Sequence, residues 1–210
     1  MTPTVGATLC LTLVAIPTRP RAESMIIRLQ NCLSQPWKNG LGRTREIAVY
    51  PPGAGSEHFL WRISIADVDS DAPFSRLPGI DRQIVLLDGN GFTMTLDDDR
   101  VHVLRVPLRP FAFAGEAAVA VTLVDGATRD FNLMLRRTQV RGDVLPWQQP
   151  GARTVDRGIV LIYCADGVVD TSDGPMQAGD AWLPSPGPTA LVTLQRGASA
   201  LAVRIAPHPG

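Results

Sequence analysis

The stretch Gly-Asp-Ala-Trp-Leu-Pro-Ser-Pro-Gly at positions 179–187 places an apolar triplet between a glycine turn and two prolines. Glycine permits the tight backbone of the turn, and proline suits the start of a strand at the edge of a sheet. Similar punctuation recurs as Pro-Pro-Gly at 51–53 and as Asp-Gly-Asn-Gly at 88–91. Turns repeated at such short intervals predict a chain of short strands.

Short apolar or alternating runs fill the intervals between these turns. The chain has 19 glycines and 18 prolines, and it shows no long amphipathic helical pattern. This density of short strands predicts an all-β barrel or sandwich. The expected strands are Met25–Leu29, Thr44–Tyr50, Leu60–Val68, Gln83–Leu87, Phe92–Leu96, Val101–Val106, Ala118–Val124, Phe131–Leu135, Gly158–Cys164, Val168–Thr171, Ala181–Leu183, Ala190–Gln195 and Ala200–Ile205.

The overall composition argues against several classes of partner. The 210 residues carry 20 basic and 20 acidic side chains, which balance. There is no basic stripe or helix-turn-helix pattern, so we expect neither direct nucleic-acid binding nor membrane association. Cys10, Cys32 and Cys164 stand far apart, which disfavours a zinc knuckle or dithiol site and fits a reducing, cytoplasmic compartment.

Residues 1–24 differ from the rest of the chain. The apolar run Val5–Ile16 is too short to cross a bilayer, and Arg19 follows it, whereas a signal peptide carries its basic residues before the apolar run. Met25 is the more natural first residue. We expect residues 1–24 to be a disordered extension or a misassigned start, with a secretory leader as the alternative.

A faint internal repeat indicates two β units. Asp-Arg-Gln-Ile-Val-Leu at 81–86 is similar to Asp-Arg-Gly-Ile-Val-Leu at 156–161, and an Asp-Gly turn follows each copy. A duplicated unit would produce this pattern, although Asp-Arg before an apolar strand also occurs by chance. We expect a first barrel at 25–140, a connector at 141–156 and a second unit at 157–206, packed together as one domain.

The chemistry-bearing residues do not form a metal or nucleophile motif. His58, His102 and His208 lie in separate segments, without the clustered histidines of a metal-binding barrel. The sequence contains no Gly-x-Ser-x-Gly elbow, phosphate loop or dinucleotide loop. We therefore expect no metal and no cofactor, and we assign no catalytic residue.

The segment Pro36–Glu46 combines a tryptophan, three cations and two glycines just before a strand-like run. Lys38 is the only lysine of the chain, and it lies between Trp37 and Asn39 beside a flexible turn. Such a segment can present hydrogen-bond donors to an anionic or carbonyl-bearing small molecule. A surface turn with a packed tryptophan is the alternative interpretation.

Two expected strands align polar side chains that suit a carboxylate ligand. Because side chains alternate along a strand, Asn132, Met134 and Arg136 share one face of the run that starts at Phe131. Arg62 likewise lies on the face of its expected strand that is opposite to the face of its apolar neighbours. Arginine matches a carboxylate with two parallel N–H groups, and an amide can fix the orientation of the ligand. The alternative is that these arginines are exposed strand ends.

Together these motifs resemble the HutD/Ves family, a bacterial group of the RmlC-like cupin superfamily. The resemblance begins with Pro-Trp-Lys-Asn-Gly-x-Gly-x-Thr-Arg-Glu-Ile at 36–47 and runs to the C-terminus. Leu41 departs from it, since the family usually has a third consecutive glycine there. The turn at 179–187 is similar to the Gly-Asp…Pro…Gly turn of cupin barrels. The other matching motifs are Trp-Arg-x-Ser-x-Ala at 61–66, Pro-Phe-Ser at 73–75, Pro-Gly-x-Asp-Arg at 78–82, and Asp-Phe-Asn-Leu-Met at 130–134 followed by Arg136 and Arg137.

The resemblance implies a bicupin, with two double-stranded β-helix barrels in one chain and usually no metal. HutD members are linked to histidine utilisation, where they are thought to bind a small intermediate such as formylglutamate or urocanate and to restrain expression or flux. Ves members are linked to stress or cold response. Carried over by motif, the candidate ligand-binding residues are Trp37, Lys38, Asn39, Thr44, Arg45, Trp61, Arg62, Arg82, Asn132, Met134 and Arg136.

The expected function is therefore metal-free binding of a small carboxylate, with a regulatory role in histidine utilisation. The alternatives are a Ves-like stress-response protein and a cupin enzyme acting on such a carboxylate, with Glu46, Asp81 or His102 as acid or base. A protein-interaction module without a small ligand is a further alternative. The sequence does not choose between formylglutamate and urocanate, and it leaves a homodimer open.

Overall fold

The computed structural model describes residues 24–37, 39–55, 57–97, 99–185 and 189–209. Strands dominate these ranges, and the one helix within them is the short 3-10 turn η1 (Leu29–Asn31). In the same part of the chain, no helix is long and apolar enough to cross a membrane. The expected all-β fold is confirmed. Apart from Ser24, the predicted N-terminal extension lies outside the described residues.

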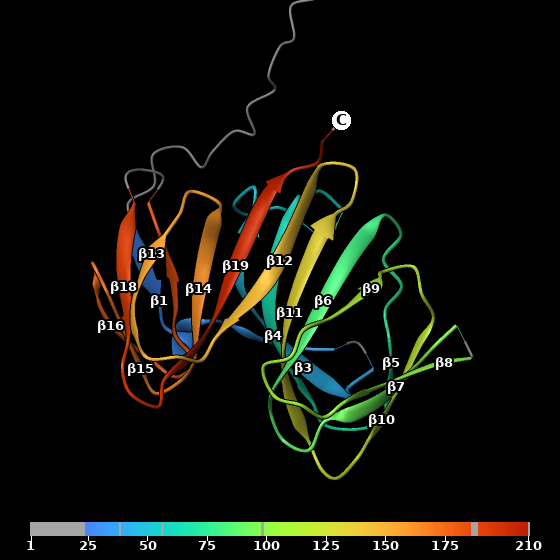
Figure 1. Ribbon diagram of the computed structural model, residues 1–210. Coiled ribbons are helices and arrows are strands. Elements are labelled where there is room, and N and C mark those ends of the chain that lie inside the picture. The colour runs from blue at the N-terminus through green and yellow to red at the C-terminus, as the bar shows by residue number, and fades with distance from the viewer. Residues whose placement is uncertain (1–23, 38, 56, 98, 186–188, 210) are drawn as a thin grey trace, which may run out of the picture.

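The first unit consists of two antiparallel sheets that enclose a barrel (Figure 1). One sheet has six strands in the order β2-β3-β4-β11-β6-β9, and the other has four in the order β5-β10-β7-β8. The strands are β2 (Ser34–Pro36), β3 (Gly42–Tyr50), β4 (Trp61–Val68), β5 (Ala72–Phe74), β6 (Ile80–Asp88), β7 (Phe92–Leu96), β8 (Arg100–Leu104), β9 (Phe111–Ala114), β10 (Val119–Leu123) and β11 (Thr128–Arg136).

The second unit repeats this arrangement on a smaller scale. Its sheets have five strands in the order β1-β17-β14-β19-β12 and four in the order β13-β18-β15-β16, again antiparallel. The strands are β1 (Met25–Ile27), β12 (Val140–Trp147), β13 (Gly151–Val155), β14 (Ile159–Asp166), β15 (Val168–Thr171), β16 (Gly174–Gln177), β17 (Ala181–Leu183), β18 (Ala190–Leu194) and β19 (Ser199–Pro207).

The expected connector at 141–156 is instead part of the second unit. Its residues form β12, at the edge of the five-stranded sheet, and β13, at the edge of the four-stranded one. Pro146 lies in the edge strand β12, where proline is tolerated because one side of the strand has no partner. β1 also pairs with β17, so the first strand of the described residues belongs to the second unit.

A single apolar core joins the two units. Phe131, Leu133 and Leu135 of β11 pack in one buried cluster with Leu201 and Val203 of β19, so the six-stranded and five-stranded sheets meet face to face. Figure 1 shows β12 beside β11 at the middle of the molecule. Because every second residue of β11 faces this shared core, the alternate residues face the interior of the first barrel.

Each unit also has an interior core of its own. Phe92, Met94 and Leu96 of β7 are fully buried in the first barrel. Met176 of β16 and Trp182 of β17 are buried in the second. The structure therefore has three apolar layers in sequence: the first interior, the shared core and the second interior.

We expect Leu133→Ala to lower the free energy of unfolding by about 2 to 5 kcal/mol, because it opens a cavity in the core that both units share. The matched change Leu191→Ala, at a leucine of β18 that is 59% exposed, should alter it by less than about 0.5 kcal/mol. Urea unfolding followed by circular dichroism measures both. Equal losses in the two variants would contradict the shared core.

Candidate functional site

Three neighbouring strands of the six-stranded sheet direct polar side chains into the first barrel. In the register of these strands, Asn132 of β11 lies beside Ser64 of β4. Met134 of β11 lies between Arg62 of β4 and Arg82 of β6. Ser64, Arg82 and Asn132 are buried. The alternation predicted from the sequence thus places these side chains together on one face of the sheet.

Arg82 is a buried cation held between two aromatic rings. The residue is 6% exposed, and its guanidinium carbon lies 5.1 Å from the centre of the Phe74 ring and 4.8 Å from that of Phe113. Its Nη2 donates a 3.2 Å hydrogen bond to Oδ1 of Asn132, while its Nε has no partner among the described residues. Burial lowers the pKa of Arg82 to about 10, although Asp130 opposes this, so the group stays charged at neutral pH.

Asp130 is the buried acid of the same cluster. It is fully buried, and the amide of Asn132 donates to its Oδ2 at 3.4 Å. Its Oδ1 has no hydrogen-bond partner in the described part of the chain. Burial raises the pKa of Asp130 to about 7, although Arg82 and Asn132 act in the opposite direction. Both protonation states of this carboxyl group are therefore populated near neutral pH.

Trp37 closes one side of the cluster. Its indole Nε1 donates to Oγ1 of Thr44 at 2.8 Å, and its ring meets Phe74 edge-on at a centroid distance of 6.3 Å. Gly42 permits this approach, because a Cβ there would lie 3.1 Å from the Trp37 ring and 2.6 Å from a backbone carbonyl oxygen. Phe74 contacts both Trp37 and Arg82, and so it links the first sequence motif to the buried arginine.

The rim of the cluster is more exposed. Nε of Arg62 donates to Glu46 at 2.8 Å, and the two side chains are 24% and 40% exposed. Asn39 stabilises the turn that leads into β3, because its Oδ1 accepts a 3.1 Å hydrogen bond from the backbone N–H of Leu41. Lys38, another candidate ligand-binding residue, lies outside the described residues.

Other predicted residues do not join the cluster. Arg45 follows Thr44 directly on β3 and faces the opposite side of the sheet, and Trp61 is packed in the shared core. Arg136 donates to two backbone carbonyl oxygens, at 2.9 and 2.7 Å. The candidate ligand-binding residues therefore do not all line one cavity. Adjacent residues of a strand face opposite sides, so Arg45 cannot line the same pocket as Thr44, nor Trp61 the same pocket as Arg62.

Sequence reasoning also missed members of the cluster. Asp130 lies two residues before Asn132 on the same strand, so the alternation that selected Asn132 would have selected it too. Phe74 stood within a quoted motif but was not named as a site residue. Phe113 lies on β9 and carried no local signal, because its place beside Arg82 depends on the pairing of β6 with β9.

No group of three or more histidine, cysteine, aspartate or glutamate side chains within the described ranges could hold a metal ion. The residues considered as acid or base also lie apart from one another. Glu46 and Asp81 each pair with an arginine, and His102 stacks on Phe111 at 3.5 Å. The arrangement is that of a buried polar cluster suited to binding an anion.

The interior of the second barrel differs from that of the first. Its core consists of apolar side chains, among them Cys164, Val169, Met176 and Trp182. Five of the seven buried polar residues within the described ranges belong to the first unit (Ser64, Arg82, Thr128, Asp130 and Asn132), and the other two, Asp180 and Ser199, belong to the second unit. The fold and this cluster define the class of the protein: a cupin-type protein with two barrels and a candidate binding site inside the first.

Comparison with known proteins narrows this class. The HutD family model matches residues 29–202, and the chain belongs to the HutD family. It is 39% identical over 148 residues to Protein Ves of Cronobacter sakazakii, covering 70% of this chain and 75% of that protein. It is 36% identical over 152 residues to an uncharacterized 21.2 kDa protein in the hutC 3′ region of Pseudomonas putida, covering 72% of this chain and 78% of that protein.

Solved structures show the same family and fold. HutD from Pseudomonas fluorescens SBW25 superposes with a TM-score of 0.77 at 27% identity, covering 89% of this chain and 100% of that one. A conserved protein of unknown function from Pseudomonas aeruginosa PAO1 gives a TM-score of 0.77 at 30% identity, covering 88% of this chain and 99% of that one. The bicupin fold implied by the resemblance is therefore confirmed.

The buried carboxyl group of Asp130 predicts a pH dependence of stability. Its pKa in the folded state, about 7, is above that of an unfolded aspartate, so the folded state holds the proton more tightly and loses stability as pH rises from about 4 to about 7. Asp130→Asn removes this dependence. Its stability relative to the wild type should therefore increase by up to about 1.4 kcal/mol per pH unit across that range and level off above it.

Urea unfolding at a series of pH values between 4 and 8 measures this difference, with Asp143→Asn on the exposed surface of β12 as the matched control. A constant difference between Asp130→Asn and the wild type at every pH would show that Asp130 does not titrate in this way.

Proposed function

We propose that the interior of the first barrel binds a small carboxylate and that the protein uses this binding to regulate histidine utilisation. The observation that carries the proposal is the buried guanidinium of Arg82, which is positioned by Phe74, Phe113 and Asn132 and keeps an unpartnered Nε. A planar guanidinium offers parallel N–H groups that match the two oxygens of a carboxylate.

The groups around Arg82 suit the rest of such a ligand. The carboxyl group of Asp130, when protonated, can donate a hydrogen bond from its unpartnered Oδ1 position. The amide of Asn132 already joins the side chains of Arg82 and Asp130 and fixes their orientation. Trp37 and Phe74 supply an apolar wall. Low polarity around these donors strengthens each hydrogen bond to a bound anion.

Met134 provides a route to the buried cation. It lies between Arg62 and Arg82 in the register and is 9% exposed. Its unbranched thioether side chain has several rotatable bonds and can move without disturbing the backbone. The ligand would enter beside the Arg62–Glu46 pair as Met134 swings aside, and Arg62 would then hold its outer polar end.

The family and its relatives support histidine utilisation as the setting. The chain is similar to HutD of Pseudomonas fluorescens, whose structure was obtained in a formate condition, and to a protein in the hutC 3′ region of Pseudomonas putida. Formylglutamate offers two carboxylates to Arg82 and Arg62, and urocanate offers one carboxylate and a planar ring. The polar rim at Arg62 and Glu46 favours formylglutamate, whose second carboxylate and formamide group can use it.

A Ves-like role is the second candidate. The chain is 39% identical to Protein Ves of Cronobacter sakazakii and 37% identical to that of Escherichia fergusonii. In this alternative the same cluster binds its carboxylate during a stress or cold response. The two roles differ in the growth condition under which loss of the protein changes gene expression.

We expect formylglutamate to raise the melting temperature of the protein without being converted, and Arg82→Lys to weaken its binding by about tenfold or more. Lysine keeps the positive charge but loses the planar fork. Isothermal titration calorimetry measures the affinity, and chromatography of the ligand after incubation measures turnover. Urocanate is titrated in parallel.

Two controls separate this effect from loss of folding. Arg141→Lys changes an exposed arginine of β12 in the same way and should bind as the wild type does. Arg62→Gln acts at a partly exposed position and should weaken binding without unfolding the barrel. Wild-type affinity in Arg82→Lys, or turnover of the ligand, would contradict the proposed binding role.

The regulatory role predicts a separate result in cells. In bacteria whose gene for this protein has been deleted, expression of the wild-type protein should lower the expression of histidine-degrading enzymes during growth on histidine. Expression of the Arg82→Lys variant should not. Quantitative reverse-transcription PCR measures this, with cold-shocked cultures as the comparison. An effect of the wild-type protein in cold-shocked cells alone would favour the Ves-like role.

A further inference from the structure

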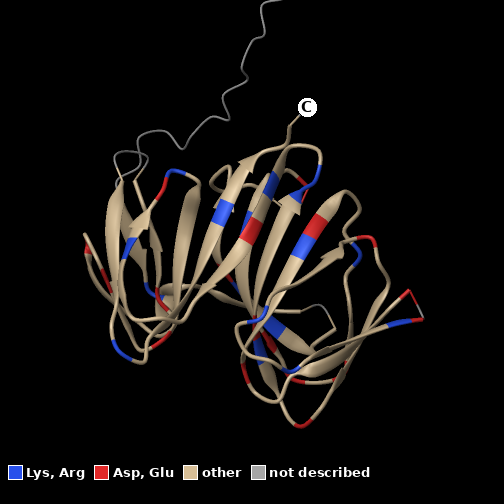
Figure 2. Cartoon of the chain, viewed as in Figure 1, with Lys and Arg blue, Asp and Glu red and all other residues tan. Residues whose placement is uncertain are grey.

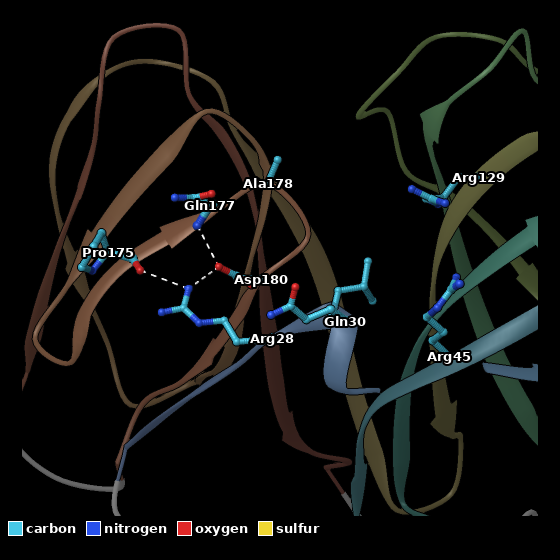
Figure 3. A pocket seen from close by; sticks show the side chains of 9 residues that line it. Arg28, Gln30, Arg45, Arg129, Pro175, Gln177, Ala178 and Asp180 are labelled. Atoms are coloured by element: carbon cyan, nitrogen blue, oxygen red, sulfur yellow. Dashed lines mark hydrogen bonds and ion pairs between the residues drawn. The ribbon is translucent and has the colours of Figure 1, made fainter. Parts of the chain in front are cut away.

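A cavity of about 600 Å³ lies between the two units, on the opposite side of the six-stranded sheet from the buried cluster (Figure 3). We propose that this cleft is a second binding site, which takes a small anion such as a carboxylate or a phosphate. The proposal does not depend on a ligand in the first barrel. Arg45 and Arg129 line one wall of the cleft, and Arg28, Gln30, Gln177 and Asp180 line the other.

One wall of the cleft carries two arginines that share a single carboxylate. Arg45 donates to Oδ2 of Asp67 at 2.6 Å, and Arg129 donates to Oδ1 of the same group at 2.7 Å. Burial opposes ionisation of Asp67, but these two hydrogen bonds keep its pKa below the usual value. Asp88, exposed at the end of β6, lies opposite Arg129 in the register, and its negative charge adds to that of Asp67 in raising the pKa of Arg129. The shared carboxylate thus faces two full positive charges.

The arginines of this wall keep donors available for a ligand. Each guanidinium has five N–H groups, and Asp67 occupies one group of each in the hydrogen bonds that the structure shows. The side chains of Arg45 and Arg129 are 24% and 41% exposed, so they remain accessible from the cleft. Figure 3 shows both of them on the same side of the cavity.

The opposite wall comes from the second unit and is polar but close to neutral. Arg28 pairs with Asp180 and also donates to the carbonyl oxygen of Pro175 at 3.3 Å. The carboxylate of Asp180 accepts a further hydrogen bond from the backbone N–H of Gln177 at 2.9 Å. The side chains of Gln30 and Gln177 add amide groups at the base and wall of the cleft (Figure 3).

These two walls define the chemistry of the occupant. An anionic group would bind to Arg45 and Arg129, and an uncharged polar group would bind to the amides of Gln30 and Gln177. The volume lies within the usual range for small-molecule sites. Because the walls belong to different units, a bound molecule would contact both barrels at once.

The test uses the full-length protein and two probes, inorganic phosphate and the dicarboxylate glutarate, titrated separately by isothermal calorimetry. Ala178→Glu and Ala178→Gln form the matched pair, because Ala178 is exposed and lies on the wall opposite Arg45 and Arg129, so both variants leave these two arginines in place. The two variants have side chains of nearly equal size and differ in charge.

We expect the wild type to bind at least one probe, and Ala178→Glu to bind it about tenfold or more weakly than Ala178→Gln, because the new carboxylate repels the anion and competes for the arginines. Arg129→Gln should weaken binding similarly, and the binding that Ala178→Glu removes should persist in Arg82→Lys. Whichever probe binds more tightly identifies phosphate or carboxylate as the preferred group.

Equal affinities in Ala178→Glu and Ala178→Gln would overturn the proposal, and so would the absence of binding of either probe at millimolar concentration. Loss of binding in Arg82→Lys but not in Ala178→Glu would place the anion inside the first barrel and also overturn it. Formylglutamate titrated into Ala178→Glu tests the first-barrel site separately, so failure of one site is distinguishable from failure of the other.

Discussion

The apolar core shared by the six-stranded and five-stranded sheets is the constraint on which the rest of the structure depends. It commits one face of β4 and β11 to apolar contacts, so the other face has to line the first barrel. A shift of one residue in β11 would turn Asp130 and Asn132 into the apolar layer, where their polar atoms would lack partners. Packing between the units therefore fixes where the polar cluster lies. Figure 2 marks basic and acidic positions on the central strands as well as in the loops.

Arg82 shows how the first barrel accommodates a charge that burial alone would exclude. The loss of hydration is offset by two aromatic faces, the amide of Asn132 and the nearby carboxyl group of Asp130. The second barrel has an apolar core in the corresponding space. The interiors of the two β units therefore differ: the first contains a buried polar cluster, and the second is filled with apolar side chains.

The central strands could be predicted from the sequence because their apolar residues alternate and Asp-Gly turns bound them. The missed strands lie mainly at sheet edges: β2, β5, β12 and β16 each end a sheet and each contain a proline, which locally resembles a break. The site was predictable where alternation alone decides it, as for Arg62 and Asn132. Alternation also places Thr44 and Arg45 on opposite faces of β3. They were nevertheless predicted to line the same site, because both belong to the motif at 36–47. Phe113 required the pairing of β6 with β9, which no local pattern reveals.

The pairing of β1 with β17 means that the second barrel is not a contiguous piece of the chain. β17 is three residues long and meets β14 through only two residue pairs, so β1 covers an edge that would otherwise be open. A fragment that starts at β12 would expose that edge to pairing with other copies of itself. β1 therefore holds the second barrel closed by pairing with β17. Cleavage of the chain between the two units would favour aggregation over two separately folded halves.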